Sequence, residues 1–158
     1  MIAALGVPQD ALTPLEEALS FFRSQGNRFG LGGALIGLAA VHGLLGQYQA
    51  GRVAYREALA LFAEARNLPS MGGLFDVIST LESSAGRHAE AIRVMGAAAA
   101  LRESTGASAP LLRMGQGDVQ NIARQALGDV AVDEALAEGR RMTLEEAVDY
   151  ASGLADAV

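Results

Sequence analysis

An internal repeat is the feature that most constrains how this 158-residue chain can fold. When the sequence is aligned with itself after a shift of about 40 residues, the spacing between Glu17 and Glu57, identical residues align in both helices of an expected helix pair. The matches are Glu17/Glu57, Ala18/Ala58, Leu19/Leu59, Phe22/Phe62, Asn27/Asn67, Gly32/Gly72, Gly33/Gly73, Gly46/Gly86, Ala58/Ala98 and Leu61/Leu101. A fixed period of roughly 40 residues indicates stacked helix pairs, in which each pair buries its apolar side against its neighbours.

The composition favours an all-α fold. Hydrophobic residues make up 51% of the chain but aromatic residues only 5%, and there are four prolines. Alanine, leucine and glycine must therefore supply the packing surfaces. We expect a right-handed α-solenoid of antiparallel helix pairs over residues 14–106, with an N-terminal extension at 1–13 and a C-terminal helical cap at 107–158. The expected helices of the repeat region are 14–25, 28–45, 48–66, 70–85 and 88–104, and those of the cap lie within 111–127, at 131–140 and from Thr143 to about Leu154.

Capping residues mark where three of these helices should begin. Thr13 and Thr143 are each followed three residues later by a glutamate, the capping-box spacing, and Pro14 suits the first helical position. Ser70 is the expected N-cap of the helix at 70–85.

The repeat resembles the tetratricopeptide family. The positions that carry the resemblance are Leu38, Ala39, Gly46, Tyr48, Gly51, Tyr55 and Ala58, followed in the next copy by Ile78, Ser79, Gly86, His88, Ala91, Met95 and Ala98. The period of roughly 40 residues exceeds the value of about 34 residues in that family, so the helices should be longer than its standard. The resemblance implies a fold and a role in protein interaction.

The C-terminal half carries a second resemblance. Residues 96–106, 126–128 and 137–147 look like the C-terminal region of large bacterial ATP-binding transcriptional regulators of the LuxR and AfsR type. In those proteins a helical-repeat sensor region follows an ATPase domain. This sequence contains neither a phosphate-binding loop nor a basic recognition helix, so the resemblance implies the repeat region of such a regulator. A free-standing scaffold that binds a peptide or a small amphipathic ligand is the alternative.

Several classes of function are disfavoured. The net charge is −6 and every basic residue is an arginine, which argues against direct binding to nucleic acid. There are no cysteines, no third ligand converges with the two histidines, and no arrangement of nucleophile, base and acid is visible. We expect no enzyme activity, no cofactor, no metal and no membrane segment, and a cytoplasmic location, since no signal peptide is apparent.

The first helix of each repeat should line a groove. The candidate groove residues are Arg28, Gly33, Ile36, Ala40, Asp76, Thr80 and Ser83. Asp76, Thr80 and Ser83 fall at i, i+4 and i+7, so they should form one polar wall opposite an apolar one. The alternative is an ordinary solvated face beside a partner surface.

The partner is expected to be another protein or an upstream domain of the same polypeptide. Because the helix at 14–25 has no preceding partner helix, its apolar side should be covered by residues 1–12, by such a domain, or by a second copy in a homodimer. We also expect His42 and Glu82, which occupy equivalent positions in successive copies of the repeat, to approach each other.

Overall fold

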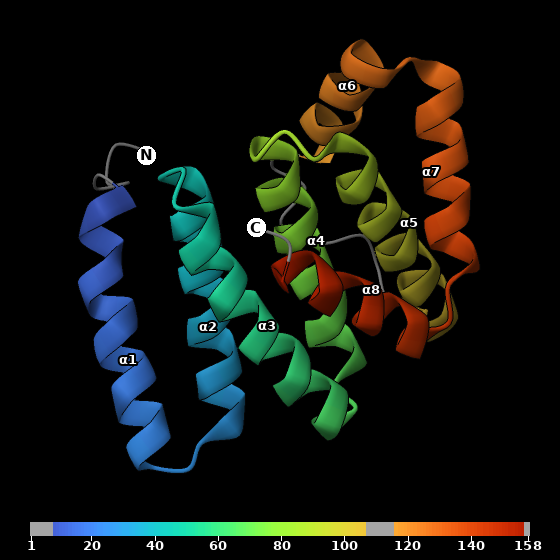
Figure 1. The fold of residues 1–158 in the computed structure, drawn as a ribbon. Helices are drawn as coiled ribbons and strands as arrows, with labels where there is room; N and C mark the ends of the chain where they lie inside the picture. Colours follow the sequence, from blue (N-terminus) through green and yellow to red (C-terminus); the bar gives the residue numbers. More distant parts are fainter. Residues whose placement is uncertain (1–7, 107–115, 157–158) are drawn as a thin grey trace.

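The structure is a computed structural model that describes residues 8–106 and 116–156. Within these ranges the regular elements are all helical and there is no strand, so the all-α expectation is confirmed for them (Figure 1). The elements are a short 3-10 helix, η1 (Pro8–Ala11), and eight α-helices: α1 (Leu12–Ser24), α2 (Arg28–Leu44), α3 (Tyr48–Ala65), α4 (Leu68–Ser84), α5 (His88–Thr105), α6 (Gln116–Leu127), α7 (Asp129–Arg141) and α8 (Leu144–Asp156).

Helices α1 to α5 pack in chain order, each against the next, and α2 also contacts α4. They run alternately up and down across Figure 1. Beyond α5 the order changes, because α6 contacts α4, α5 and α7, while α7 lies along α5. The last helix, α8, turns back and packs on α3 and α5.

A left-handed residue follows α1 to α5 at intervals of 20 positions. Glycines 26, 46, 86 and 106 have φ values of 64°, 71°, 82° and 63°, and Arg66, with φ of 50°, occupies the remaining position. Glycine is common at this point because it has no Cβ to clash in the left-handed conformation. The even spacing gives helices α2 to α5 nearly equal lengths and keeps the connections short.

Two cores result from this arrangement. The larger core joins α2, α3, α4, α5 and α8, and its fully buried large side chains include Leu35, Tyr55 and Phe75. The smaller core lies between α5, α6 and α7 and includes Ile92 and Val132. Helix α5 contributes to both and therefore connects the larger core to α6 and α7.

The helix starts test the predicted caps. Thr143 and Glu146 form the expected capping box, since each backbone N–H donates to the side chain of the other, at 2.8 and 3.1 Å. The prediction for Thr13 is wrong, because α1 begins at Leu12 after Ala11 and has no side-chain cap. The prediction for Ser70 is also wrong, since Asn67 caps α4 by accepting a hydrogen bond from the backbone N–H of Ser70.

Asn27 caps α2 in the same way, through the N–H of Gly30. The repeated asparagine is thus the true start signal in both copies of the repeat. An asparagine side chain can satisfy a free N–H of the first turn, whereas Ser70 lies three residues beyond the cap, inside its helix. The first part of the expected helix at 111–127 lies outside the described residues.

Candidate partner-binding site

An exposed apolar stripe runs along α2. Phe29, Gly33, Ile36, Ala40 and Leu44 recur at i, i+4, i+7, i+11 and i+15, so they share one face of the helix. Phe29 and Leu44, at the two ends, are 76% and 74% exposed. Gly33 is exposed, and Ile36 and Ala40 are half-buried. Three of the predicted groove residues therefore lie on an open apolar surface, which we call the α2 stripe.

Arg28 lies at the start of α2, next to Phe29, and is exposed. Its guanidinium donates to both carboxylate oxygens of Glu64 on α3, at 3.1 and 2.5 Å. This pairing raises the pKa of Arg28 and lowers that of Glu64, mainly through the side-chain hydrogen bond. Exposed ion pairs of this kind contribute little to stability, so a carboxylate of a partner could take the place of Glu64 at small cost.

The expected polar wall on α4 is an internal contact between helices. Asp76 is only 6% exposed, and its carboxylate accepts two hydrogen bonds from Arg102 on α5, at 3.1 and 2.9 Å. The Thr80 hydroxyl donates to the Asp76 carbonyl at 3.0 Å, and Ser83 is buried. The exposed part of the candidate groove is therefore the α2 stripe.

Arg102 is not among the residues predicted from the sequence, although the repeat contains a signal for it. The shift that superposes the copies places Asp76 on Ile36 and Arg102 on Phe62. Both positions are apolar in the first copy and charged in the second. A paired change from apolar to opposite charges is what a new ion pair between α4 and α5 requires.

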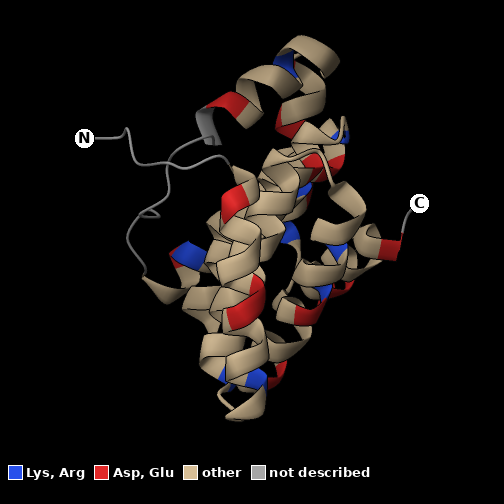
Figure 2. Cartoon of the chain, turned by 90° about the vertical axis from the view of Figure 1, so that its left-hand side faces the viewer, with Lys and Arg blue, Asp and Glu red and all other residues tan. Residues whose placement is uncertain are grey.

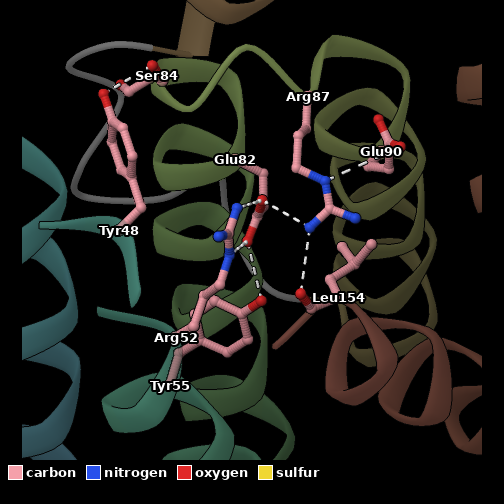
Figure 3. A network of polar contacts seen from close by, with 8 residues as sticks. All are labelled: Tyr48, Arg52, Tyr55, Glu82, Ser84, Arg87, Glu90 and Leu154. Atoms are coloured by element: carbon pink, nitrogen blue, oxygen red, sulfur yellow. Dashed lines mark hydrogen bonds and ion pairs between the residues drawn. The ribbon is translucent and has the colours of Figure 1, made fainter. Parts of the chain in front are cut away.

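A buried polar network lies where α3, α4 and α5 meet (Figure 3). Glu82 on α4 is 0% exposed. Its carboxylate accepts from Arg52 at 3.0 and 2.7 Å, from the Tyr55 hydroxyl at 2.9 Å and from Arg87 at 3.3 Å. The charge of the buried carboxylate is thus compensated, as a buried charge requires. Burial is the main cause that raises the pKa of Tyr55, and the neighbouring Glu82 charge adds to it.

The expected contact between His42 and Glu82 is absent from the hydrogen bonds of the described residues. The Nδ1 atom of His42 lies 2.7 Å from Oε1 of Gln47, just beyond the end of α2. Glu82 is instead held by the two arginines and the tyrosine. Arginine competes well for this position because its planar fork binds a carboxylate through two parallel hydrogen bonds.

The network also holds α8 in place. Arg87, which precedes α5, donates to the backbone carbonyl of Leu154 at 3.1 Å, within the last turn of α8 (Figure 3). Arg56 on α3 binds Asp156 at the end of the same helix at 2.5 Å. Carbonyls of a last helical turn lack partners within the helix, so these arginines fix the position of α8 on α3 and α5.

The arginines of this protein mainly join helices. Of the eleven that the structure describes, nine form ion pairs with carboxylates; they are Arg23, Arg28, Arg52, Arg56, Arg87, Arg93, Arg102, Arg124 and Arg140. Figure 2 views the molecule from the side of α1, where acidic and basic residues are interspersed. The exposed residues of α1 include Glu16, Glu17 and Phe21. Most of the described cations therefore pair with carboxylates of the same chain.

Over residues 8–106 and 116–156 no group of three histidine, aspartate or glutamate residues lies close enough to hold a metal ion. Among the same residues, no helix has the length and apolar character needed to span a bilayer.

Comparison with known proteins relates the chain to regulators of transcription. It is 35% identical over 95 residues to proteins of Mycobacterium tuberculosis and Mycobacterium bovis that are described as "putative HTH-type transcriptional regulator". The aligned part spans 60% of this chain and 11% of each of these relatives. No protein-family model matches the chain, and no solved structure matches it. The chain is thus distantly related to a segment of much longer proteins.

Proposed function

We propose that this chain is a non-catalytic, tetratricopeptide-like region of a bacterial transcriptional regulator and that it binds a protein partner or another domain of its polypeptide through the α2 stripe. The solenoid arrangement, the relation to LuxR- and AfsR-type regulators and the cytoplasmic location are parts of this proposal. Its support is the internal repeat, the order in which α1 to α5 pack, and the similarity to regulator segments.

The single observation that carries the proposal is the exposure of the α2 stripe. Residues 29–41 contain no charged side chain, and Phe29 and Leu44 are mostly in contact with solvent. Apolar residues at this helical spacing bind the apolar face of another helix or an extended peptide well. At about 25 cal/mol per Å², covering one large side chain contributes roughly 1.5–3 kcal/mol.

Gly33→Arg tests the stripe at its centre. A Cβ at Gly33 would meet no atom within 4 Å, so the substitution should not disturb the fold, and arginine is a better helix former than glycine. Gly153→Arg is a matched control, since Gly153 is exposed on α8 and also has open space around its Cβ. Both substitutions add the same charge to a helix of the same molecule.

Each substitution is introduced into the chromosomal gene that encodes this chain. The transcripts of the whole genome are then measured in each strain and compared with those of a strain in which the gene is deleted. We expect deletion to change a defined set of transcripts, Gly33→Arg to reproduce most of that change, and Gly153→Arg to leave the set at wild-type levels. The melting temperatures of the two purified variants should agree. Unchanged transcription after deletion would refute the regulator role, and a Gly33→Arg strain that behaves as wild type would refute binding by the stripe.

A free-standing scaffold for a small amphipathic ligand is the second candidate. The same stripe favours it, because an apolar strip beside the exposed Arg28 suits a molecule with one apolar and one acidic end. Native mass spectrometry of the purified chain distinguishes the two. A bound small molecule that is lost in Gly33→Arg and retained in Gly153→Arg would favour the scaffold.

A further inference from the structure

We infer that the outward face of α7 is a self-association surface, on which a second copy of this chain packs with its own α7 antiparallel. The proposed self-association surface is independent of the α2 stripe, which lies on another helix. It also differs from the homodimer through the first helix expected from the sequence, because the contact is made by α7 and not by α1.

The α7 face is open and hollowed. Val130, Glu134, Ala137 and Arg141 recur at i, i+4, i+7 and i+11, so they line one side of the helix. A shallow hollow of about 420 Å³ lies along this side, bordered by these residues together with Asp133 and Glu138. Val130 is 72% exposed. The opposite side of α7 is packed on α5, where Gly139 touches the backbone of Arg93.

The charges on this face are self-complementary. Asp133 is held by Arg124, and Glu138 by Arg93. Glu134 and Arg141 form no ion pair with any described residue, and they are seven residues, or two helical turns, apart. When two α7 helices cross antiparallel about a twofold axis near Ala137, each Glu134 faces the Arg141 of the other copy. The twofold axis forms this ion pair between Glu134 and Arg141 twice, so both charges on both molecules have a partner.

A second copy fits this face better than an unrelated acidic or basic partner does. The chain carries a net charge of −6, so two copies repel each other over most of their surfaces. On the α7 face the charges left without internal partners are one glutamate and one arginine, and their sum is zero. Ala137, at the centre, is small enough to let the two helix backbones come close. A single pair of helices buries less than about 1,200 Å², so the dimer should be weak, with a Kd in the micromolar range or above.

Charge reversal gives a specific test. In Glu134→Arg the face carries two positive charges, and in Arg141→Glu two negative charges. Each variant alone should dissociate, with Kd raised at least about tenfold, because like charges then face each other across the axis. An equimolar mixture of the two should associate again, and so should the double variant E134R/R141E, within about threefold of the wild-type Kd. Glu17→Arg on α1 is the control and should associate at least as well as the wild type.

Sedimentation velocity of residues 1–158, from roughly 10 to 500 µM in low salt, measures these equilibria. Circular dichroism verifies that each variant retains its helices. A wild-type chain that stays monomeric over this range overturns the inference. It is also overturned by a dimer that both single reversals leave intact, or by reversals that dissociate the dimer but fail to associate when mixed. A dimer lost only in Glu17→Arg would place the interface on α1.

Discussion

Helices α5 and α7 approach each other backbone to backbone, and this contact gives the sharpest prediction about stability. A Cβ placed on Gly139 would lie 1.9 Å from the carbonyl oxygen of Arg93, and one placed on Gly96 would lie 2.3 Å from the carbonyl oxygen of Leu136. Real Cβ atoms keep about 3.0 Å from such neighbours. Because the atoms in the way belong to backbone, a rotamer change cannot relieve the clash in Gly139→Ala.

The cost follows from the movement that alanine would force. The two helices must separate by about 1.1 Å, the difference between 3.0 and 1.9 Å. A gap of this size loses a quarter to a half of the dispersion energy along the contact, which includes Ile92 and Val132. Overpacking of this kind costs about 3 kcal/mol. Alanine regains about 1 kcal/mol through its helix propensity, so the net loss should be about 2 kcal/mol.

Thermal unfolding followed by circular dichroism measures this loss. A change of about 2 kcal/mol should lower Tm by roughly 4–8 °C in a chain of this length. Gly33→Ala and Gly72→Ala are matched controls, since neither Cβ would meet an atom within 4 Å. They should raise Tm slightly, because only the helix-propensity gain remains. If Gly139→Ala is as stable as these two variants, then α5 and α7 do not make this backbone contact.

Three further predictions concern single side chains. Glu82→Gln removes the buried charge that Arg52 and Arg87 share, so it should lower the free energy of unfolding in urea by about 3 kcal/mol. The control is Glu57→Gln, which breaks only the exposed pair with Arg23 and should lower it by less than about 0.5 kcal/mol. Burial raises the pKa of Tyr55 above its ordinary value of 10.0, so above pH 10.0 only the unfolded state loses the phenol proton. The free energy of unfolding should therefore be unaffected by this group below pH 10.0 and should fall as the pH rises above it. Tyr55→Phe should make this fall less steep. Arg66 occupies a left-handed position with φ of 50°, so Arg66→Gly should raise the free energy of unfolding by about 0.5–1 kcal/mol, and an unchanged urea midpoint would contradict this.

The positions of the helices could be predicted from the sequence because local chemistry sets them. The observed ends of α1 to α5 lie within two residues of those expected, and the left-handed turn residues that follow these helices recur every 20 positions. Two predicted caps are wrong for a physical reason. Residue type alone favours Thr13 and Ser70, but the helices begin earlier, at Leu12 and Leu68, where Asn67 provides the N-cap of α4.

The side-chain partners could be predicted much less well. Superposing the copies of the repeat makes His42 and Glu82 equivalent and predicted a contact between them, yet the carboxylate is bound by Arg52 of the neighbouring helix α3. Asp76 lies on α4 as expected, but Arg102 covers it from α5. A repeat states which helices are equivalent. The repeat does not predict which of several arginines binds a given carboxylate, because this depends on side-chain length and on the crossing angle of the helices.

The placement of α8 depends on features that no repeat pattern contains. Its buried face is mostly alanine, with Ala147, Ala151 and Ala155 at intervals of four residues. Alanine faces allow close packing but select no particular partner, since any small-residue surface accepts them equally. Selectivity comes from the polar ends, where Arg87 binds the Leu154 carbonyl and Arg56 binds Asp156. Because α8 returns to α3 and α5, it is not stacked on α7 as a further repeat helix would be, and the outward side of α7 keeps Val130, Glu134 and Arg141 exposed to solvent. The chain turns back after Arg141. This turn places α8 against α3 and α5, and it also leaves the outward face of α7 open for the proposed self-association.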